Sequence, residues 1–274
     1  MTVSSSVTSN LAARTRGWIA RHPALFEIGI LLLTYGIYFV VRISAQGDLD
    51  EARGVADAIV RIEKIFLLDV EQSWNAFVVD IGWLRVLSAY WYFSLHYVVT
   101  ISILLTAYFR FPRHYRPLRR ALLASTFVAL ALYILMPTAP PRHMPSGYTD
   151  VVAMTMGWND GQPTQDVENL SEFTNEFAAF PSMHAGWALW AMLAIFALTR
   201  SPIWRGVGVA YASLTAVDVV VTANHWVIDI FAGWAIIYVG YLVFRRGLPE
   251  PGEFKREFRR SRSSEPQSSV PAAR

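Results

Sequence analysis

Residues 203–244 read IWRGVGVAYASLTAVDVVVTANHWVIDIFAGWAIIYVGYLVF, and this stretch decides the fold. It contains two apolar runs, Ile203–Thr222 and Trp226–Phe244, each long enough to cross the ~30 Å hydrocarbon core of a bilayer as a helix. Only Ala223, Asn224 and His225 separate the two runs. We therefore expect two membrane-crossing helices joined as a tight antiparallel hairpin.

The composition of the whole chain supports a membrane protein. Of its 274 residues, 54% are hydrophobic and only 16% are charged, whereas soluble domains carry about 25% charged residues. The 10 Trp, 12 Tyr and 16 Phe are the residue types that line bilayer interfaces. The chain has no cysteine, which excludes disulfides, thiolate chemistry, Cys-ligated zinc and iron–sulfur clusters. This composition excludes a disordered chain and argues against an ordinary cytosolic domain.

Four further apolar stretches bring the number of expected crossings to six. The fold class that this predicts is all-α: a polytopic membrane protein with a six-transmembrane-helix bundle. The crossings are expected at Ala24–Val41, Val86–Phe109, Ala121–Met136, Met183–Thr199, Ile203–Thr222 and Trp226–Phe244.

The distribution of Lys and Arg orients these crossings. With both termini cytoplasmic, most of the 24 basic residues fall inside, including a basic loop at Arg110–Arg120 and a basic tail at Lys255–Arg262. This is the positive-inside asymmetry of an integral plasma (inner) membrane protein. The tail is expected to meet anionic lipid, and no nucleic-acid partner is expected.

The predicted organisation has three parts. Residues 1–23 form a cytoplasmic segment, 24–244 a membrane catalytic domain, and 245–274 a basic cytoplasmic tail expected to be disordered. Within the catalytic domain, 48–80 is expected to form amphipathic helices on the outer interface, because Val55, Ile59, Ile62 and Phe66 recur at helical spacing, and 137–182 an ordered outer loop.

The first apolar run has an alternative interpretation as a cleaved signal peptide. Arg14–Arg21 resembles the basic start of a signal, and Ile43–Ala45 weakly resembles a cleavage site. The run is longer than most signal cores, and Glu27 interrupts it near its start. We therefore favour a retained first helix.

Three polar clusters that are distant in sequence are predicted to meet at the outer membrane face. Polar side chains in or beside crossings are costly, so they indicate function. The clusters are Pro137–His143 (PTAPPRH), Phe180–His184 (FPSMH) and Asn224–Asp229 (NHWVID).

His225 and Asp229 are the first candidate catalytic pair. Their i, i+4 spacing places them on one helix face, so the carboxylate can accept a hydrogen bond from one imidazole nitrogen. The other nitrogen is then available as a nucleophile or base. The alternative is a buried His–Asp pair that only locks two helices together.

His184, Ser182 and Arg142 extend this candidate site. Ser182 is placed to cap a helix whose first turn contains His184, and a helix N-terminus attracts anions. Arg142 adds a positively charged guanidinium group, whose paired N–H groups can bind two phosphate oxygens. Taken alone, His184 can be an interfacial histidine and Arg142 a snorkelling arginine. Two His, one Asp and one Arg together suit phosphoryl transfer: one His attacks phosphorus, the other protonates the leaving oxygen, and Arg stabilises the charge.

FPSMHA at 180–185 and HWVIDIFAG at 225–233 resemble the second and third signature motifs of the type-2 phosphatidic acid phosphatase superfamily. PTAPPR at 137–142 is similar to a segment of its inositol phosphorylceramide synthase-like branch. The likeness extends from about Asp50 to Phe244 and includes Tyr92–His96. The resemblance implies that His225 forms a phosphohistidine, Asp229 orients it, and His184 is the general acid. It also implies that Ser182 and Arg142 contact phosphate and that no metal or other cofactor is needed.

The sequence departs from the phosphatase pattern before the third motif. Those enzymes carry Ser-Arg there, whereas this chain has Asp218 and Val219. Loss of that cation favours a phosphodiester headgroup over a bare phosphomonoester dianion. The departure therefore favours transfer of a phosphate-containing, inositol phosphate-like headgroup between lipids. A lipid phosphatase with water as acceptor is the alternative. The remaining substrate-binding candidates are Pro141, Asp218 and Asn224.

The expected partners are membrane phospholipids or isoprenyl phosphates as substrates, with a diacylglycerol or ceramide-type lipid as a possible acceptor.

Two other functional classes remain open. His184, His225 and Asp229 could ligate zinc, although Arg142 would repel a cation. A transporter or lipid-binding scaffold could use the cluster for recognition alone, although transporters place such groups near the midplane. His96, deeper in its crossing, is interpreted as a partner in an interhelical hydrogen bond. The oligomeric state is left open.

Overall fold

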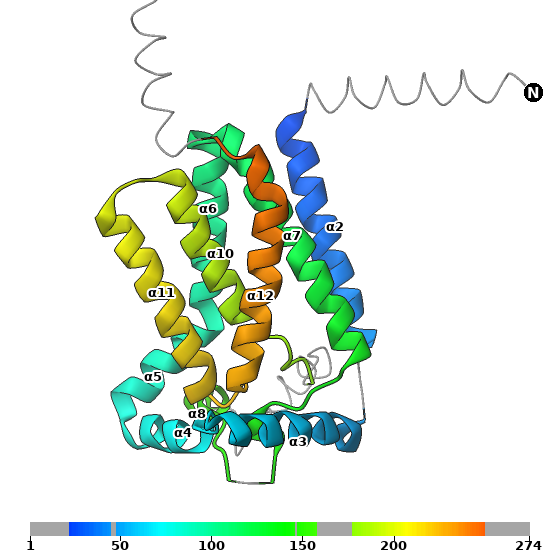
Figure 1. Ribbon diagram of the computed structural model, residues 1–274, viewed down its shortest axis with the longest axis vertical. Helices are drawn as coiled ribbons and strands as arrows, with labels where there is room; N and C mark the ends of the chain where they lie inside the picture. The colour runs from blue at the N-terminus through cyan, green and yellow to red at the C-terminus, as the bar shows by residue number, and fades with distance from the viewer. Residues whose placement is uncertain (1–21, 45–47, 146, 158–176, 250–274) are drawn as a thin grey trace, which may run out of the picture. The chain divides into compact units, whose positions relative to one another are not determined.

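The computed structural model describes residues 22–44, 48–145, 147–157 and 177–249 (Figure 1). These residues are all-helical, and the one β-type pairing among them is an isolated bridge between Thr138 and Ala178. The chain divides into two compact units, Met1–Ser44 and Ala45–Arg274. The first contains the helix α2 (Pro23–Ser44), which includes the expected first crossing Ala24–Val41.

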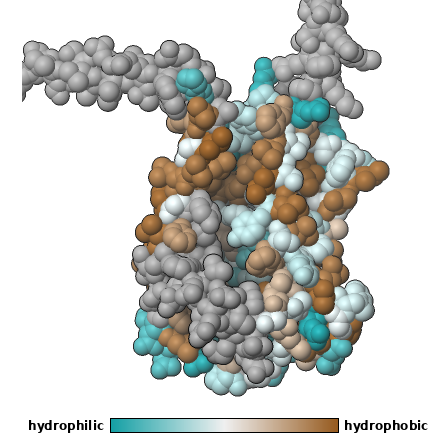
Figure 2. Space-filling view, turned by 180° about the vertical axis from the view of Figure 1, so that it is seen from behind, coloured by the Kyte–Doolittle hydropathy of each residue, from teal (hydrophilic) through white to brown (hydrophobic). Residues whose placement is uncertain are grey.

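Four helices of the second unit are long and apolar enough to cross a membrane. Helix α10 (Met183–Leu198) is shorter and α2 is not among these four, so the six crossings expected from the sequence are not all confirmed. Hydrophobic residues cover much of the visible helical surface (Figure 2). The four candidate spans are a composite helix Gly82–Arg110, made of α5 (Gly82–Tyr90), the π-helical turn η1 (Trp91–Leu95) and α6 (His96–Arg110); α7 (Pro112–Leu135); α11 (Pro202–Val221); and α12 (Val227–Phe244), extended by η4 to Gly247.

Helix α10 (Met183–Leu198) contacts α6, α7, α11 and α12 within the bundle. It is apolar but only 16 residues long. Its fully buried residues include Ala188, Ala191 and Ala194, whose small side chains allow neighbouring helices to approach closely. The closest approach is to α12, where a Cβ atom added to Gly233 would lie 2.1 Å from the carbonyl oxygen of Ser182.

Two shorter helices, α3 (Leu49–Phe66) and α4 (Glu71–Asp80), run across the end of the bundle where α11 ends and α12 begins (Figure 1). The sequence predicted amphipathic interfacial helices here, and both segments are helical. Ile62 and Phe66 are 45% and 67% exposed. The residues of α3 that pack inward are Ala52, Ala56, Ile59 and Glu63.

The basic segment Arg110–Arg120, expected to be a loop, is mostly helical. Phe111 alone separates α6 from α7, which begins at Pro112. Proline at a first helical position has a preset φ and lacks only an N–H that would be unpaired there. The helix therefore starts before the apolar run. As a result, α7 is 24 residues long and contains most of the basic residues of this segment.

The predicted outer loop 137–182 contains two short helices, η2 (Pro141–His143) and α8 (Val151–Met156). Its central part, 158–176, lies outside the described residues. Three other parts of the chain also lie outside the described residues. They are most of the predicted cytoplasmic segment 1–23, residues 45–47 between α2 and α3, and most of the basic tail, from residue 250 onward.

Candidate active site

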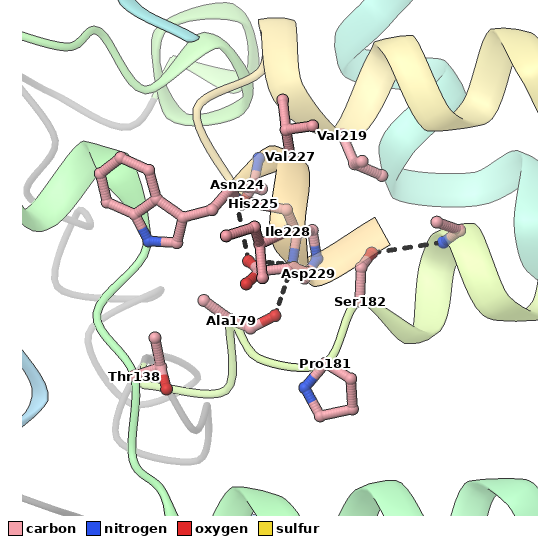
Figure 3. Close-up of polar contacts among 12 residues, drawn as sticks. Thr138, Ala179, Pro181, Ser182, Val219, Asn224, His225, Val227, Ile228 and Asp229 are labelled. Atoms are coloured by element: carbon pink, nitrogen blue, oxygen red, sulfur yellow. Dashed lines mark hydrogen bonds and ion pairs between the residues drawn. The ribbon is translucent and has the colours of Figure 1, made fainter. Parts of the chain in front are cut away.

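The structure brings the three polar clusters together at one end of the bundle (Figure 3). The N–H of Ser182 donates to the carbonyl of Asp229 at 2.9 Å, joining the second cluster to the third. The N–H of Arg142 donates to the carbonyl of Ala223 at 3.1 Å, joining the first cluster to the same loop. Backbone bonds therefore fix the relative positions of segments that are far apart in sequence.

His225 lies in the short connection between α11 and α12, and its side chain is buried. Its Nδ1 is 2.8 Å from the carbonyl oxygen of Ala179 and 3.4 Å from Oδ2 of Asp229 (Figure 3). The carbonyl can only accept, so Nδ1 carries the proton and Nε2 carries the lone pair. Burial, together with the smaller effect of the positive charge of Arg142, lowers the pKa of His225 to about 3. The ring is therefore neutral and nucleophilic at Nε2.

Asp229 is fully buried in the first turn of α12. Its Oδ2 accepts the N–H of Trp226 at 2.8 Å, so the carboxylate caps the helix as well as facing His225. Its Oδ1 has no hydrogen-bond partner among the described residues. The predicted His–Asp pair thus forms, with the carboxylate divided between the imidazole and the helix start.

His184 lies in the first turn of α10, one residue after the helix begins. Its ring centroid is 5.8 Å from that of His225. Tyr92 stacks on His184 at 4.1 Å with an interplanar angle of 20°, and His96 meets its edge at 4.2 Å. The two histidines therefore lie close enough to act on opposite sides of one small group.

Tyr92 belongs to the π-helical turn η1, and His96 begins α6 immediately after it. Such turns widen a helix locally and are frequent at functional sites. Nδ1 of His96 is 3.1 Å from the carbonyl of Tyr92 in the same helix. The interhelical hydrogen bond expected for His96 is therefore replaced, at this nitrogen, by one within its own helix.

Arg142 is held by two side chains. Its Nη1 donates to Oδ1 of Asn224, and its Nε is 3.4 Å from Oδ2 of Asp150. Asn224 is buried and also donates from Nδ2 to the carbonyl of Thr222 at 3.2 Å. Pro141, the residue before Arg142, is buried at the start of η2. Arg142 is close enough to His225 to influence its pKa.

Ser182 is fully buried as the N-cap of α10, where its Oγ accepts the N–H of Ala185 at 3.3 Å (Figure 3). The predicted cap is therefore present, and the hydroxyl still has its own hydrogen to donate.

Asp218 is buried in α11 and accepts a hydrogen bond from Ser88 of α5. Val219 is fully buried among Ala185, Tyr92 and other apolar side chains.

Two glutamates complete the site, although the sequence did not single them out. Oε1 of Glu63 accepts the N–H of Ile228 at 2.8 Å, and Oε1 of Glu71 accepts the N–H of Val227 at 3.1 Å. Both glutamates are buried. Together they satisfy two of the four backbone donors that the start of α12 leaves unpaired.

The pKa of Glu63 is raised to about 9, chiefly by burial and also by the nearby charge of Glu71. Glu63 is therefore protonated near neutral pH. The signal missed in the sequence is that this Glu lies on the same helix face as Ala52, Ala56 and Ile59, four residues beyond Ile59. In the described part of the chain, no group of three or more His, Cys, Asp or Glu side chains is arranged to hold a metal ion.

Comparison with known families identifies one match. A sequence model described as the PAP2 superfamily matches residues 57–243, which is more than half of the chain and includes all three polar clusters. Comparisons with curated proteins and with solved structures gave no significant match. The chain therefore belongs to the PAP2 superfamily, and this membership indicates a membrane-associated lipid phosphatase or phosphotransferase.

Proposed function

We propose that this protein is an integral membrane lipid phosphotransferase that moves a phosphate-containing, inositol phosphate-like headgroup from one lipid to another. The observation that carries the proposal is the position of Nδ1 of His225 between two oxygen acceptors, Ala179 O and Asp229 Oδ2. This arrangement leaves the Nε2 lone pair for attack on phosphorus, with His184 5.8 Å away between ring centroids.

The reaction then has two displacement steps. In the first, Nε2 of His225 bonds to phosphorus, the bond from phosphorus to the lipid oxygen breaks, and His184 gives its proton to that oxygen. In the second, the acceptor hydroxyl gives its proton to His184 and bonds to phosphorus, which releases His225. Arg142 stabilises charge on the equatorial oxygens, and Asp229 stabilises the positive charge that develops on the phosphorylated ring.

Two structural features favour a phosphodiester headgroup as the donor. Val219 occupies the position where the phosphatases of the superfamily carry a phosphate-binding Arg, and it is fully buried among apolar side chains. The remaining cation, Arg142, is partly neutralised by Asp150 at 3.4 Å. A phosphodiester carries one negative charge and a phosphomonoester up to two, so this site suits the diester better.

The proposal also includes a topology. Six crossings with both termini cytoplasmic would place the site at the outer face of the plasma (inner) membrane. The start of α10, the end of α11 and the start of α12 meet at one end of the bundle, as that topology requires. The exposed apolar side chains Ile65, Phe66 and Phe77 of the α3–α4 region suit a position at the interface.

The test uses purified protein in detergent with EDTA. Phosphatidylinositol, phosphatidic acid and isoprenyl phosphates are offered as donors, with diacylglycerol and ceramide as acceptors, and mass spectrometry follows the products. His225→Ala serves as the blank, and His22→Ala, in the first unit, as the matched control. A headgroup on a new lipid supports the proposal. Free phosphate without a new phospholipid would instead establish a lipid phosphatase with water as acceptor.

The covalent intermediate has its own test. A donor labelled in its phosphate is mixed with the enzyme and quenched, and label on the protein is followed in acid and in alkali. We expect acid-labile, alkali-stable label that is absent from His225→Ala. Turnover in the His225→Ala protein at the wild-type rate would rule out the mechanism.

A further inference from the structure

Asp150 performs two tasks with one carboxylate. Its Oδ1 accepts the N–H of Ala153 at 2.9 Å and so caps α8. Its Oδ2 lies 3.4 Å from Nε of Arg142. The two side chains are 25% and 19% exposed, so water screens their attraction only in part.

Arg142 has a second side-chain partner of a different kind. Asn224 accepts from Nη1 through a neutral amide oxygen, and the backbone N–H of Arg142 donates to Ala223. Two of the three contacts are therefore uncharged. Asn224 holds the guanidinium and the backbone bond holds the main chain of Arg142, and neither adds a charge, whereas Asp150 places a negative charge beside the guanidinium.

The charge of Asp150 acts on whatever anion Arg142 binds. A carboxylate near a bound phosphate repels a dianion about twice as strongly as a monoanion at the same distance. We propose that Asp150 is a specificity-determining residue that favours monoanionic phosphodiesters over dianionic phosphomonoesters at Arg142. This inference rests on the proposed function, because it assumes that Arg142 faces the phosphate of the substrate.

Asp150→Asn is the variant that separates the two tasks. Asparagine is as good an N-cap as aspartate, so its side-chain oxygen can still accept the N–H of Ala153. The change removes only the charge next to Arg142. Asp48→Asn is the matched control, because Asp48 caps α3 in the same way, accepting the N–H of Asp50 at 2.8 Å.

The first measurement is the ratio of kcat/KM for phosphatidic acid to kcat/KM for phosphatidylinositol at pH 8. We expect Asp150→Asn to raise this ratio about tenfold over wild type, and Asp48→Asn to leave it unchanged. An unchanged ratio in Asp150→Asn would overturn the inference. So would an equal loss of both activities, which would show that Asp150 only supports the structure of α8 and the η2 segment.

The second measurement does not depend on the identity of the lipid. Binding of inorganic phosphate at pH 8, followed by phosphorus NMR, should be about tenfold tighter in Asp150→Asn than in wild type. If wild type hydrolyses phosphomonoesters and transfers no headgroup, the proposed function fails, while tighter phosphate binding would still support the role of Asp150. Equal affinity in the two proteins would overturn that role whatever lipid is used.

Discussion

The carbonyl oxygen of Ala179 lies 2.8 Å from Nδ1 of His225, closer than the carboxylate of Asp229 at 3.4 Å. The backbone before the FPSMH motif therefore fixes the tautomer of the histidine in the third motif. The carboxylate is left to cap α12 and to balance the charge that develops when His225 is phosphorylated. These two roles can be separated by substitution.

Asp229→Asn should fold and keep measurable activity. Its side-chain oxygen can still accept the N–H of Trp226, and Ala179 still holds the proton on Nδ1. We expect kcat to fall roughly 100-fold through loss of the negative charge, whereas His225→Ala should abolish turnover. Steady-state kinetics measure kcat for each variant, and thermal denaturation checks that each variant is folded. A loss as complete as that of His225→Ala, in a folded protein, would mean that Asp229 and not Ala179 sets the tautomer.

Much of this site was predictable from residue types alone. His184, His225 and Asp229 are costly at a membrane face, and their motifs are recognisable, so chemistry and pattern indicate the same residues. The contribution of Ala179 was not predictable, because any residue supplies a backbone carbonyl. Nothing in its side chain distinguishes it from the neighbouring Ala178.

The limits of predicting the fold from the sequence have a similar physical origin. Apolar length located the helices of the bundle, but α7 begins within a basic segment because Pro112 starts a helix well. On α3, the periodicity of the apolar residues indicated a helix but did not indicate that Glu63 packs inward. Glu63 packs inward because it is needed by a backbone N–H of α12, 165 residues away in sequence.

Tyr92 is expected to act by holding the plane of the His184 ring, on which it stacks at 4.1 Å. Tyr92→Leu removes the aromatic face and should lower kcat about tenfold, with a smaller effect on KM. Tyr92→Phe keeps the ring and should retain most of the activity. Tyr90→Leu, in the same composite helix but 55% exposed, is the control and should behave like wild type. Equal kcat values for Tyr92→Leu and Tyr92→Phe would contradict a stacking role.

Glu63 should make the protein less stable as the pH rises above neutrality. Its folded pKa is about 9 against an ordinary value of 4.5, so the folded state keeps a proton that the unfolded state loses. This contribution is complete below pH 4.5 and is lost as the pH rises toward 9. His225 and His143 act in the opposite sense. Burial lowers their pKa values to about 3 and about 4, so they destabilise the fold as the pH falls below 6.5.

Glu63→Gln isolates the alkaline part of the pH dependence of stability. Its amide oxygen can still accept the N–H of Ile228, but the side chain no longer titrates. The decrease in Tm between pH 7 and pH 9 should be smaller in Glu63→Gln than in wild type. Asp57→Asn, an exposed site on the same helix, should retain the wild-type decrease. Parallel Tm profiles for Glu63→Gln and wild type would show that Glu63 does not hold a proton in the folded state.

Gly233 should tolerate no side chain, because a Cβ atom there would lie 2.1 Å from the carbonyl oxygen of Ser182. That oxygen belongs to the backbone of the α10 cap and cannot move alone, since the N–H of Ser182 is bonded to Asp229. Gly233→Ala must therefore separate α10 from α12, at a cost of about 3 kcal/mol in the free energy of unfolding. The separation would also move His184 away from His225.

Gly206→Ala is the matched control for Gly233, because it also lies in a helix of the bundle and its added Cβ would meet nothing within 4 Å. Replacing an open helical glycine with alanine stabilises by up to about 1 kcal/mol. We therefore expect Tm to fall in Gly233→Ala and to rise slightly in Gly206→Ala. Assayed well below its Tm, Gly233→Ala should still be impaired, since its defect lies in the distance between the two histidines. Full activity at that temperature would show that the contact between α10 and α12 serves stability alone.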